Sequence, residues 1–369
     1  MNAYCILFAD NFRGDDLQGL VKNRTLASLP VAARYRMVDF MLSSLVKAGV
    51  PNTAIVTNNN YKSLVDHVGW GKDWDLNRKN SGLKIITPMS NPLSNRVATN
   101  KIEALASTII YSDSVLQEYC ILADSNIIGN VDFKEMFKFH EQTKADITVA
   151  YTYKKPERNE SELILGDNNR VVESLYHYDG WNTVCPTQVK IYIMTKELFK
   201  GIVKKGITLG WEDILRDYVS KNFATLNVSA YEIKGYCKTI NTINDYYKFN
   251  TDLLNRDIRR ELFLSGTDIL TRVQDSVPTT YGKDAVIKNS LLGDGCYIKG
   301  TVENSILFRD VEVEEGAVVR NSIIMGNVKI RKGAVLDYVI SDKYVEVKEN
   351  TELKGSENCQ VVIEKERIV

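Results

Sequence analysis

The chain has 369 residues, of which 44% are hydrophobic and 25% charged, so it has the composition of an ordinary globular protein long enough for two domains. Lysine plus arginine and aspartate plus glutamate each number 47, and no long basic run is interleaved with aromatic residues, which argues against a nucleic-acid-binding surface. The sequence shows no signal-peptide pattern and no apolar stretch of about 18 residues, so we expect a cytoplasmic protein without a membrane segment.

Cysteine and histidine usage restricts the chemistry further. Six cysteines are scattered through the sequence without a Cys-x-x-Cys pair, which favours free thiols in a reducing compartment. The only histidines are His67, His140 and His177, so a histidine-based metal site is not expected. Small anions or other proteins are therefore the expected partners.

An apolar run from Tyr4 to Ala9 predicts a buried parallel strand at the start of the chain. The loop after such a strand lies at the carboxyl end of the sheet, where α/β folds bind their ligands. A loop that wraps phosphates needs glycines, whose N–H groups can point at the oxygens, and a cation to balance the charge. The loop from Asp10 to Asp16 holds one glycine and three aspartates, so its position suits a nucleotide whereas its residues do not.

The segment from Leu20 to Phe40 resembles the start of the bacterial glucose-1-phosphate adenylyltransferases. The matching residues are Lys22-Asn23-Arg24, Pro30 and Arg34-Tyr35-Arg36-Met37-Val38-Asp39-Phe40. In that family a Gly-Gly-x-Gly-x-Arg loop is followed by an Arg-Ala-Lys-Pro block. The resemblance implies that Leu26 replaces the lysine. It also implies that the nucleotide-binding loop is degenerate, and the residues at the positions of this loop are Asp10, Asn11, Arg13 and Gly14.

Two further stretches continue the α/β pattern. The apolar residues Met37, Phe40, Met41 and Leu45 recur at helical spacing and predict a core-facing helix before a strand at 53–57. The runs His67-Val68-Gly69-Trp70-Gly71 and Trp74-Asp75-Leu76-Asn77-Arg78 then resemble the family's Gly-x-Gly-x-x-Trp-Asp-Leu-Asp-Arg block, which precedes a short strand, here 83–87. Because this block follows the first one in the same order as in the family, the two resemblances together identify the chain as a relative of that family.

The next candidate site residue is Asp124. A helical apolar face at 99–110 is followed by a strand at 119–123, and Asp124 comes directly after it. An aspartate in this place is a candidate Mg²⁺ ligand, since a magnesium ion that bridges phosphates needs only one or two carboxylates. The resemblance implies the same role, because the family has Gly-Asp-His here. Alternatively, Asp124 is a turn or helix-capping residue.

Two later positions differ from the family. After a hairpin predicted at 162–174, the family carries a lysine that holds the sugar phosphate, and the sequence Ser174-Leu175-Tyr176-His177-Tyr178 supplies none. The family's second metal aspartate is Thr239 here, and a hydroxyl brings no charge to a metal. In this interpretation Asp124 and Thr239 are vestiges, no catalytic set is intact, and Asp124 is the only metal ligand, if any.

The C-terminal part has an internal repeat. The triplets Asn289-Ser290-Leu291, Asn304-Ser305-Ile306 and Asn321-Ser322-Ile323 recur, and apolar residues return every five or six positions, as in hexapeptide turns that stack into a parallel β-helix. With the resemblance, the predicted fold is α/β. It comprises a degenerate nucleotidyltransferase-like domain at 1–255, with a Rossmann-type mixed sheet and helices on both faces, a linker at 256–283, and a left-handed parallel β-helix at 284–369.

The differences from the family together imply lost catalysis, a pattern that resembles the GlgD-type subunit of Gram-positive bacteria. The resemblance implies a role in glycogen biosynthesis as a subunit that is inactive alone and modulates a catalytic GlgC-type partner in a hetero-oligomer, expected to be a tetramer. The isolated subunit should need no cofactor, whereas the assembled enzyme should need Mg²⁺. Arg24, Arg34 and Arg36 are candidates for binding a phosphorylated effector or nucleotide; alternatively, they are exposed cations or structural ion pairs.

Two other functions are compatible with the residues. One is a catalytically competent sugar-phosphate nucleotidyltransferase with altered metal binding, which turnover by the pure protein would reveal. The other is an acyltransferase, because β-helices often host acyl-CoA chemistry. That chemistry usually needs a histidine base, and no histidine lies beyond His177.

Overall fold

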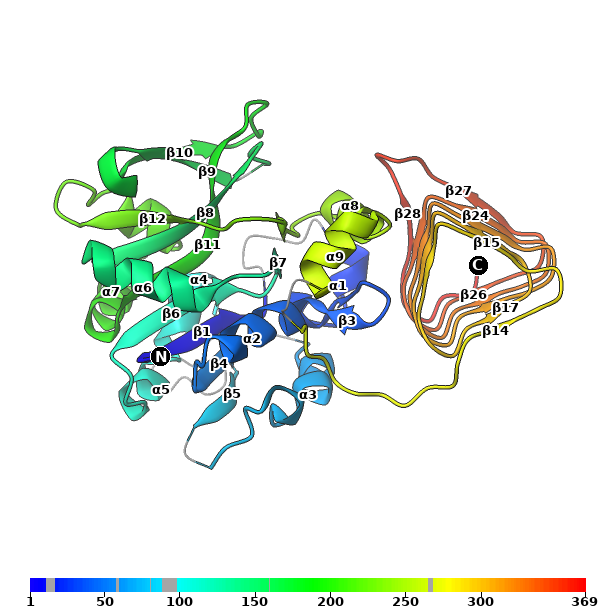
Figure 1. The fold of residues 1–369 in the computed structure, drawn as a ribbon, viewed down its shortest axis with the longest axis horizontal. Helices are drawn as coiled ribbons and strands as arrows, with labels where there is room; N and C mark the ends of the chain where they lie inside the picture. Colours follow the sequence, from blue (N-terminus) through cyan, green and yellow to red (C-terminus); the bar gives the residue numbers. More distant parts are fainter. Residues whose placement is uncertain (11–16, 58–59, 80, 88–97, 159, 265–267) are drawn as a thin grey trace. The chain divides into compact units, whose positions relative to one another are not determined.

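The computed structural model describes residues 1–369 apart from 11–16, 58–59, 80, 88–97, 159 and 265–267 (Figure 1). The chain forms two compact units. The first comprises Met1–Gly14, Thr25–Ala27 and Phe40–Thr239, and the second comprises Asp15–Arg24, Ser28–Asp39 and Ile240–Val369. The units therefore differ from the continuous domains expected at 1–255 and 284–369, because two short N-terminal stretches belong with the C-terminal part.

The first unit is built on a nine-stranded mixed sheet. Its strands follow the order β10-β9-β11-β6-β1-β4-β5, with β8 paired to β11 and β12 paired to β8. Strands β6, β1, β4 and β5 are parallel, whereas β11 is antiparallel to β6. The strands are β1 (Ala3–Phe8), β4 (Asn52–Val56), β5 (Gly82–Ile86), β6 (Tyr119–Asp124), β8 (Ile147–Lys154), β9 (Glu160–Leu165), β10 (Val171–His177), β11 (Cys185–Thr195) and β12 (Val228–Glu232).

Helices cover both faces of this sheet (Figure 1). Residues of α4, α5 and α7 form one core cluster with Tyr4, Ile6 and Phe8, which alternate along β1 and so share one face. Strand β7 (Ile127–Gly129) follows β6 in the chain. It pairs with β13 (Cys237–Thr239) in a separate two-stranded sheet. The helices are α2 (Met37–Lys47), α3 (Lys62–Val68), α4 (Lys101–Ala106), α5 (Ile109–Ser114), α6 (Phe133–Thr143), α7 (Lys196–Leu209) and a π-helical turn at Leu215–Val219.

Most predicted elements of this unit are confirmed, with one correction. The apolar stripe of α2 is fully buried, as expected for a core-facing helix. The single helix expected at 99–110 is instead two short helices, α4 and α5. The hydroxyls of Ser107 and Thr108 donate to the carbonyls of Ala104 and Leu105, at 2.6 and 2.7 Å. Such local side-chain bonds compete with the helical ladder, so the helix breaks between the two apolar segments.

The second unit contains the predicted β-helix, whose coils appear as a triangle in Figure 1. Its three parallel five-stranded sheets have the orders β14-β17-β20-β23-β26, β15-β18-β21-β24-β27 and β16-β19-β22-β25-β28. The strands are β14 (Thr280–Tyr281), β15 (Val286–Lys288), β16 (Leu291–Leu292), β17 (Tyr297–Ile298), β18 (Thr301–Glu303), β19 (Ile306–Leu307), β20 (Glu312–Val313), β21 (Val318–Arg320), β22 (Ile323–Ile324), β23 (Lys329–Ile330), β24 (Val335–Asp337), β25 (Val339–Ser341), β26 (Glu346–Val347), β27 (Glu352–Lys354) and β28 (Val361–Ile363).

The stretch expected as a linker at 256–283 is partly structured. Helix α9 (Arg256–Leu264) follows α8 (Ile243–Asp252), and β14 already pairs with β17, so the β-helix begins before residue 284. The α9 sequence is highly charged and only Leu262 is buried among its residues, which explains why its composition suggested a connection. The remaining elements of this unit are α1 (Gln18–Val21), β2 (Pro30–Val31) and β3 (Tyr35–Arg36).

Each residue of the Asn-Ser-apolar triplet has a separate structural role. Asn304 and Asn321 have positive φ angles of 47° and 46°, a conformation that asparagine tolerates better than most residues, and they turn the chain at a corner. The Ser305 hydroxyl then accepts the Ser322 N–H of the next coil at 3.1 Å. Ile323 is fully buried. The repeat thus encodes a corner, a bond between coils and a core residue.

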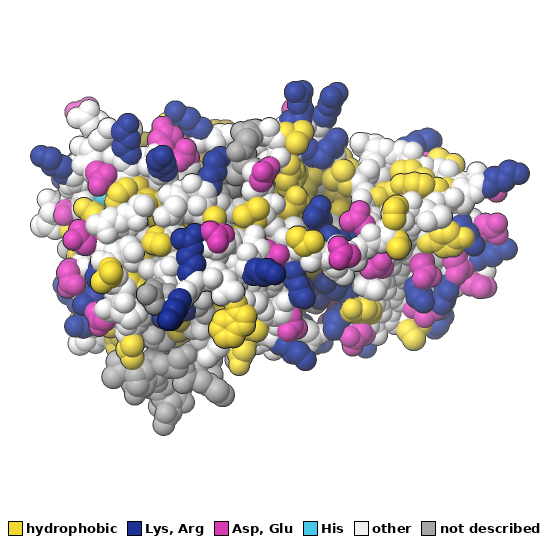
Figure 2. Space-filling view, turned by 60° about the horizontal axis from the view of Figure 1, so that its bottom comes forward, with side chains coloured by type: hydrophobic (Ala, Val, Ile, Leu, Met, Phe, Trp, Pro, Cys, Tyr) yellow, Lys and Arg dark blue, Asp and Glu magenta, His cyan; other side chains and the backbone are white. Residues whose placement is uncertain are grey.

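Alternating charges cover one sheet of the β-helix. Lys288, Glu303, Arg320 and Asp337 stand at the same register position on successive coils. Glu303 forms ion pairs with both Lys288 and Arg320, each at 3.1 Å. Figure 2 shows acidic and basic side chains interspersed over the β-helix, in keeping with the zero net charge of the chain.

All six cysteines are free thiols, as the absence of a pairing pattern predicted. Within the part of the chain that the structure describes, no helix combines the length and the apolar character needed to cross a membrane.

Candidate functional site

The candidate site lies at the carboxyl ends of β1 and β6, which are neighbouring parallel strands. Phe8 and Asp124 are partners in their register, and the N–H of Ser125 donates to the Phe8 carbonyl at 3.0 Å. Asp124 is only 8% exposed. The prediction that Asp124 comes at the end of a buried strand is therefore confirmed, and it lies at the carboxyl edge of the parallel strands, where α/β folds commonly bind ligands.

Asp124 is engaged by a lysine that sequence analysis did not single out. The ammonium of Lys101 contacts both carboxylate oxygens of Asp124, each at 2.5 Å. The two side chains are 14% and 12% exposed, so this is a largely buried ion pair. The same ammonium lies 4.8 Å from the centroid of the Phe8 ring, a cation–π contact. Lys101 is the first residue of α4, and Asn100 caps that helix by accepting the Glu103 N–H at 2.9 Å.

Thr239 lies near the same edge, on the ladder that follows β6. Strand β13 pairs with β7 so that Thr239 is opposite Ile127, three residues after Asp124. The structure thus brings the two predicted vestigial positions into the same region. Only Asp124 carries a charge, and its oxygens already accept from Lys101.

The nucleotide-loop positions are only partly described. Asp10 follows β1 and accepts a hydrogen bond from the Thr57 hydroxyl at 3.1 Å. Asn11, Arg13 and Gly14 lie outside the described residues. Leu26, which replaces the family's lysine, is 5% exposed and packs as an ordinary apolar residue.

The described residues do not fit a magnesium ion. Mg²⁺ prefers oxygen ligands in near-octahedral geometry and is commonly held by one or two free carboxylates. Here the carboxylate of Asp124 is paired with an ammonium, and Thr239 is neutral. Among the residues that the structure describes, no group of three or more His, Cys, Asp or Glu side chains could hold a metal ion.

A second lysine also faces this region. Lys190 precedes Ile191, which pairs with Ala123, so Lys190 lies level with Asp124 on the neighbouring strand β11. Its positive charge acts on Lys101: burial lowers the pKa of Lys101, Asp124 opposes that shift, and Lys190 adds to it. Sequence analysis missed both lysines because Lys101 lies in a segment analysed only for its apolar face, and Lys190 lies in an apolar strand.

His140 and His177 are each engaged in contacts that do not involve Asp124. His140 lies on α6, is 3% exposed, and its Nδ1 is 2.8 Å from the Thr148 hydroxyl. Burial lowers the pKa of His140 to about 4, so the ring is neutral near pH 7. His177 instead pairs with Glu162 at 3.0 Å and stacks on Trp181.

The three candidate effector arginines have different surroundings within the second unit. Both terminal oxygens of Asp342 accept from Arg24 Nη2, at 2.7 and 2.8 Å, and the two side chains are 5% and 2% exposed. Arg36 donates to the Ser28 carbonyl at 3.3 Å and is partly buried. Arg34 is exposed. Arg24 is thus engaged in a structural ion pair, the alternative that sequence analysis left open.

Lys343 adds another cation beside Arg24 and Arg36. Burial lowers its pKa to about 8, and the nearby positive charges of Arg36 and Arg24 act in the same direction. Asp342 opposes the shift, but its carboxylate is already paired with Arg24. Burial among positive neighbours thus disfavours the charged form of Lys343, and a bound anion would stabilise that form.

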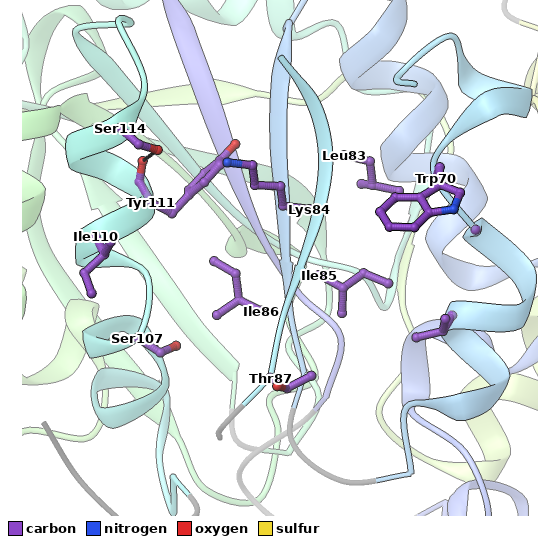
Figure 3. Close-up of a pocket in the computed structure, with 12 residues that line it drawn as sticks. Trp70, Leu83, Lys84, Ile85, Ile86, Thr87, Ser107, Ile110, Tyr111 and Ser114 are labelled. Carbon is purple, nitrogen blue, oxygen red and sulfur yellow. Dashed lines mark hydrogen bonds between the residues drawn. The ribbon is translucent and has the colours of Figure 1, made fainter. Parts of the chain in front are cut away.

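A separate hollow of about 740 Å³ lies along β5 (Figure 3). Leu83 and Ile85 point toward Trp70, whereas Lys84 and Ile86 point toward α5. Trp70 is 81% exposed, so its wall is open to solvent. Neither Asp124 nor Lys101 lines this hollow, and it is therefore distinct from the strand-end site.

Comparisons with known proteins agree with this architecture. Residues 13–172 match the nucleotidyl transferase family, and residues 275–358 match the GlmU-like C-terminal hexapeptide family. The chain is 34% identical to the glycogen biosynthesis protein GlgD of Bacillus subtilis (strain 168), over 95% of this chain and 92% of that protein. It is 33% identical to the GlgD protein of Geobacillus stearothermophilus, over 82% of this chain and 79% of that one.

An adenylyltransferase is also among the relatives. The glucose-1-phosphate adenylyltransferase of Clostridium novyi (strain NT) is 27% identical over 83% of this chain and 81% of its own length. The nucleotidyltransferase-like unit, the left-handed β-helix and the near full-length similarity lead to one conclusion. The chain belongs to the family of the GlgD glycogen biosynthesis proteins, which is similar in sequence to the glucose-1-phosphate adenylyltransferases.

Proposed function

We propose that this chain acts in glycogen biosynthesis as a GlgD-type subunit that is inactive alone and modulates a catalytic GlgC-type partner. The observation that carries the proposal is the state of the strand-end site. Asp124 is paired with Lys101, and Thr239 provides no second carboxylate. The enzyme it would join makes ADP-glucose and diphosphate from ATP and glucose 1-phosphate, with Mg²⁺ supplied to the partner's site.

Physical magnitudes support a silent site. Removing one electrostatic contact to a transition state commonly lowers the rate by about 10²- to 10³-fold. This chain differs from the catalytic pattern at the glycine loop, at Leu26, at the sugar-phosphate lysine and at Thr239. Even partial addition of such losses leaves no useful turnover.

The first test is turnover by the isolated chain. Protein purified from a host without its own adenylyltransferase should release no diphosphate from ATP and glucose 1-phosphate in the presence of Mg²⁺. The competing function, a competent nucleotidyltransferase with altered metal binding, predicts turnover within about tenfold of an ordinary enzyme's 1–10³ s⁻¹. Diphosphate release at that level would refute the proposal.

The second test is assembly. Co-expression with a GlgC-type homologue, followed by size-exclusion chromatography, should give one mixed peak, for which we expect a tetramer, and altered kinetics of the homologue. Two separate peaks and unchanged kinetics would contradict a modulating role.

We also propose that Arg34, Arg36 and Lys343 contribute to binding a phosphorylated effector or nucleotide. The support is that burial and the positive charges of Arg36 and Arg24 lower the pKa of Lys343, so a bound anion would stabilise its charged form. Arg36→Ala and Lys343→Ala should weaken the response of the mixed enzyme to such effectors and leave assembly intact. An unchanged effector response in both variants would exclude this site.

A further inference from the structure

Lys101 lies where a divalent cation would have to lie in order to use Asp124. Its ammonium touches both oxygens of the carboxylate at the same distance of 2.5 Å. The Asp124 side chain is 12% exposed, so a metal ion could reach the carboxylate mainly from the side that Lys101 covers. A metal ion and Lys101 therefore compete for the same ligand, and each repels the other.

The position of Lys101 is determined by the fold. Asn100 caps α4, and the Thr99 N–H and hydroxyl both donate to the Glu103 carboxylate, at 2.7 and 2.9 Å. Ile102, the next residue, is fully buried in the main core. These contacts hold the start of α4 on both sides of Lys101, so its ammonium reaches Asp124 from a fixed backbone.

Lys190 makes the same place less favourable for a metal. Strand β11 has an irregularity between Val189 and Tyr192 in its pairing with β8, and Lys190 lies within it. Bulges of this kind re-aim side chains and are common beside functional sites. Because Lys190 also lies level with Asp124, a second ammonium is available near this carboxylate.

We propose that Lys101 is a built-in cation that replaces the divalent metal at Asp124 and thereby closes the strand-end site to metal ions. Lost metal binding then has two causes: Thr239 is a missing ligand, and Lys101 is a competitor that is present. Removing the competitor should uncover a metal site. This goes beyond the proposed subunit role, because it concerns only the chain's own site and requires no partner.

The test uses Mn²⁺ as the probe and the full chain, treated with EDTA and then dialysed. Binding is followed by electron paramagnetic resonance of free Mn²⁺ and by water-proton relaxation. Lys101→Thr should bind Mn²⁺ at least tenfold more tightly than the unmodified chain. Lys101→Arg, which keeps the cation, should show no gain, and Lys101→Thr combined with Asp124→Asn should lose the gain.

Two results would overturn the proposal. One is Mn²⁺ binding by the unmodified chain that disappears in Asp124→Asn. The other is a Lys101→Thr chain that binds no more tightly than the unmodified chain. If Lys101→Thr is too unstable for titration, its melting temperature with and without Mn²⁺ decides: a rise with Mn²⁺ supports the proposal, and identical melting contradicts it. Neither result affects the co-expression test of the proposed function.

Discussion

Replacing Arg24 tests whether the Arg24–Asp342 ion pair is structural. In Arg24→Met, the carboxylate of Asp342 would be left 2% exposed and without the two hydrogen bonds of 2.7 and 2.8 Å. Breaking one partner of a buried pair costs about 3–5 kcal/mol, because the remaining charge is uncompensated. We expect a loss of that size in the stability of the second unit.

The assay must report on each unit separately, because two units need not unfold together. The chain has 4 tryptophans, at positions 70, 74, 181 and 211, and all of them lie in the first unit. Tryptophan fluorescence therefore reports on that unit alone. Hydrogen exchange of β-helix peptides reports on the second, where the most protected amides should exchange about 10²- to 10⁴-fold faster.

A double variant distinguishes the loss of the whole ion pair from the loss of one partner. Arg24→Met with Asp342→Leu removes both charges and should cost markedly less than Arg24→Met alone, since no unpaired buried charge remains. The reasoning would be refuted if Arg24→Met stayed within about 0.5 kcal/mol of the unmodified chain, the range typical of surface substitutions. Arg24 would then be available for an effector.

Three other predictions concern pH, packing and catalysis. Burial lowers the pKa of His140 from its ordinary 6.5 to about 4 in the folded chain. Between pH 6.5 and pH 4 the unfolded chain therefore binds more protons than the folded chain, and the stability of the folded chain falls as the pH drops through this range. Between pH 7 and pH 5 the unmodified chain should lose about 2 kcal/mol relative to His140→Gln in parallel denaturant titrations; equal losses would show that His140 is not the cause. In Gly300→Ala the new methyl group would meet the carbonyl oxygens of Ala317 and Glu314, and this clash should lower the stability by about 3 kcal/mol. At Gly316, where φ is 69°, a new methyl group would have no atom closer than 3.9 Å, so Gly316→Ala should lower the stability by only about 1–2 kcal/mol. Similar melting temperatures of the two variants would contradict this difference. Finally, Thr239→Asp alone should restore no diphosphate release, because catalytic groups that act as a unit are strongly non-additive. Activity should also require a rebuilt glycine loop across 10–16, Leu26→Lys, a lysine for the sugar phosphate and replacement of Lys101. Robust activity from Thr239→Asp alone would show that the loop has been misinterpreted.

The sequence by itself determined the parts of the fold that repeat or alternate locally. The buried run of β1 and the stripe of α2 were predictable because burial of one face imposes a period on neighbouring residues. The β-helix was predictable for the same reason, since every coil needs a corner, a bond between coils and a core residue at fixed spacing. The sequence also predicts a degenerate site, because Thr239 and the loop aspartates differ from a known motif.

Only the tertiary structure decided which charged side chains meet. Lys101 and Asp124 are 23 residues apart, and Arg24 and Asp342 are 318 apart. No local pattern encodes such a pair, because an ion pair depends on where the backbone brings two side chains and on how much water is excluded around them. The same limit explains the discontinuous units. A lysine in a helix is normally a solvated residue, and only its burial against a strand-end carboxylate makes it a substitute for a metal ion.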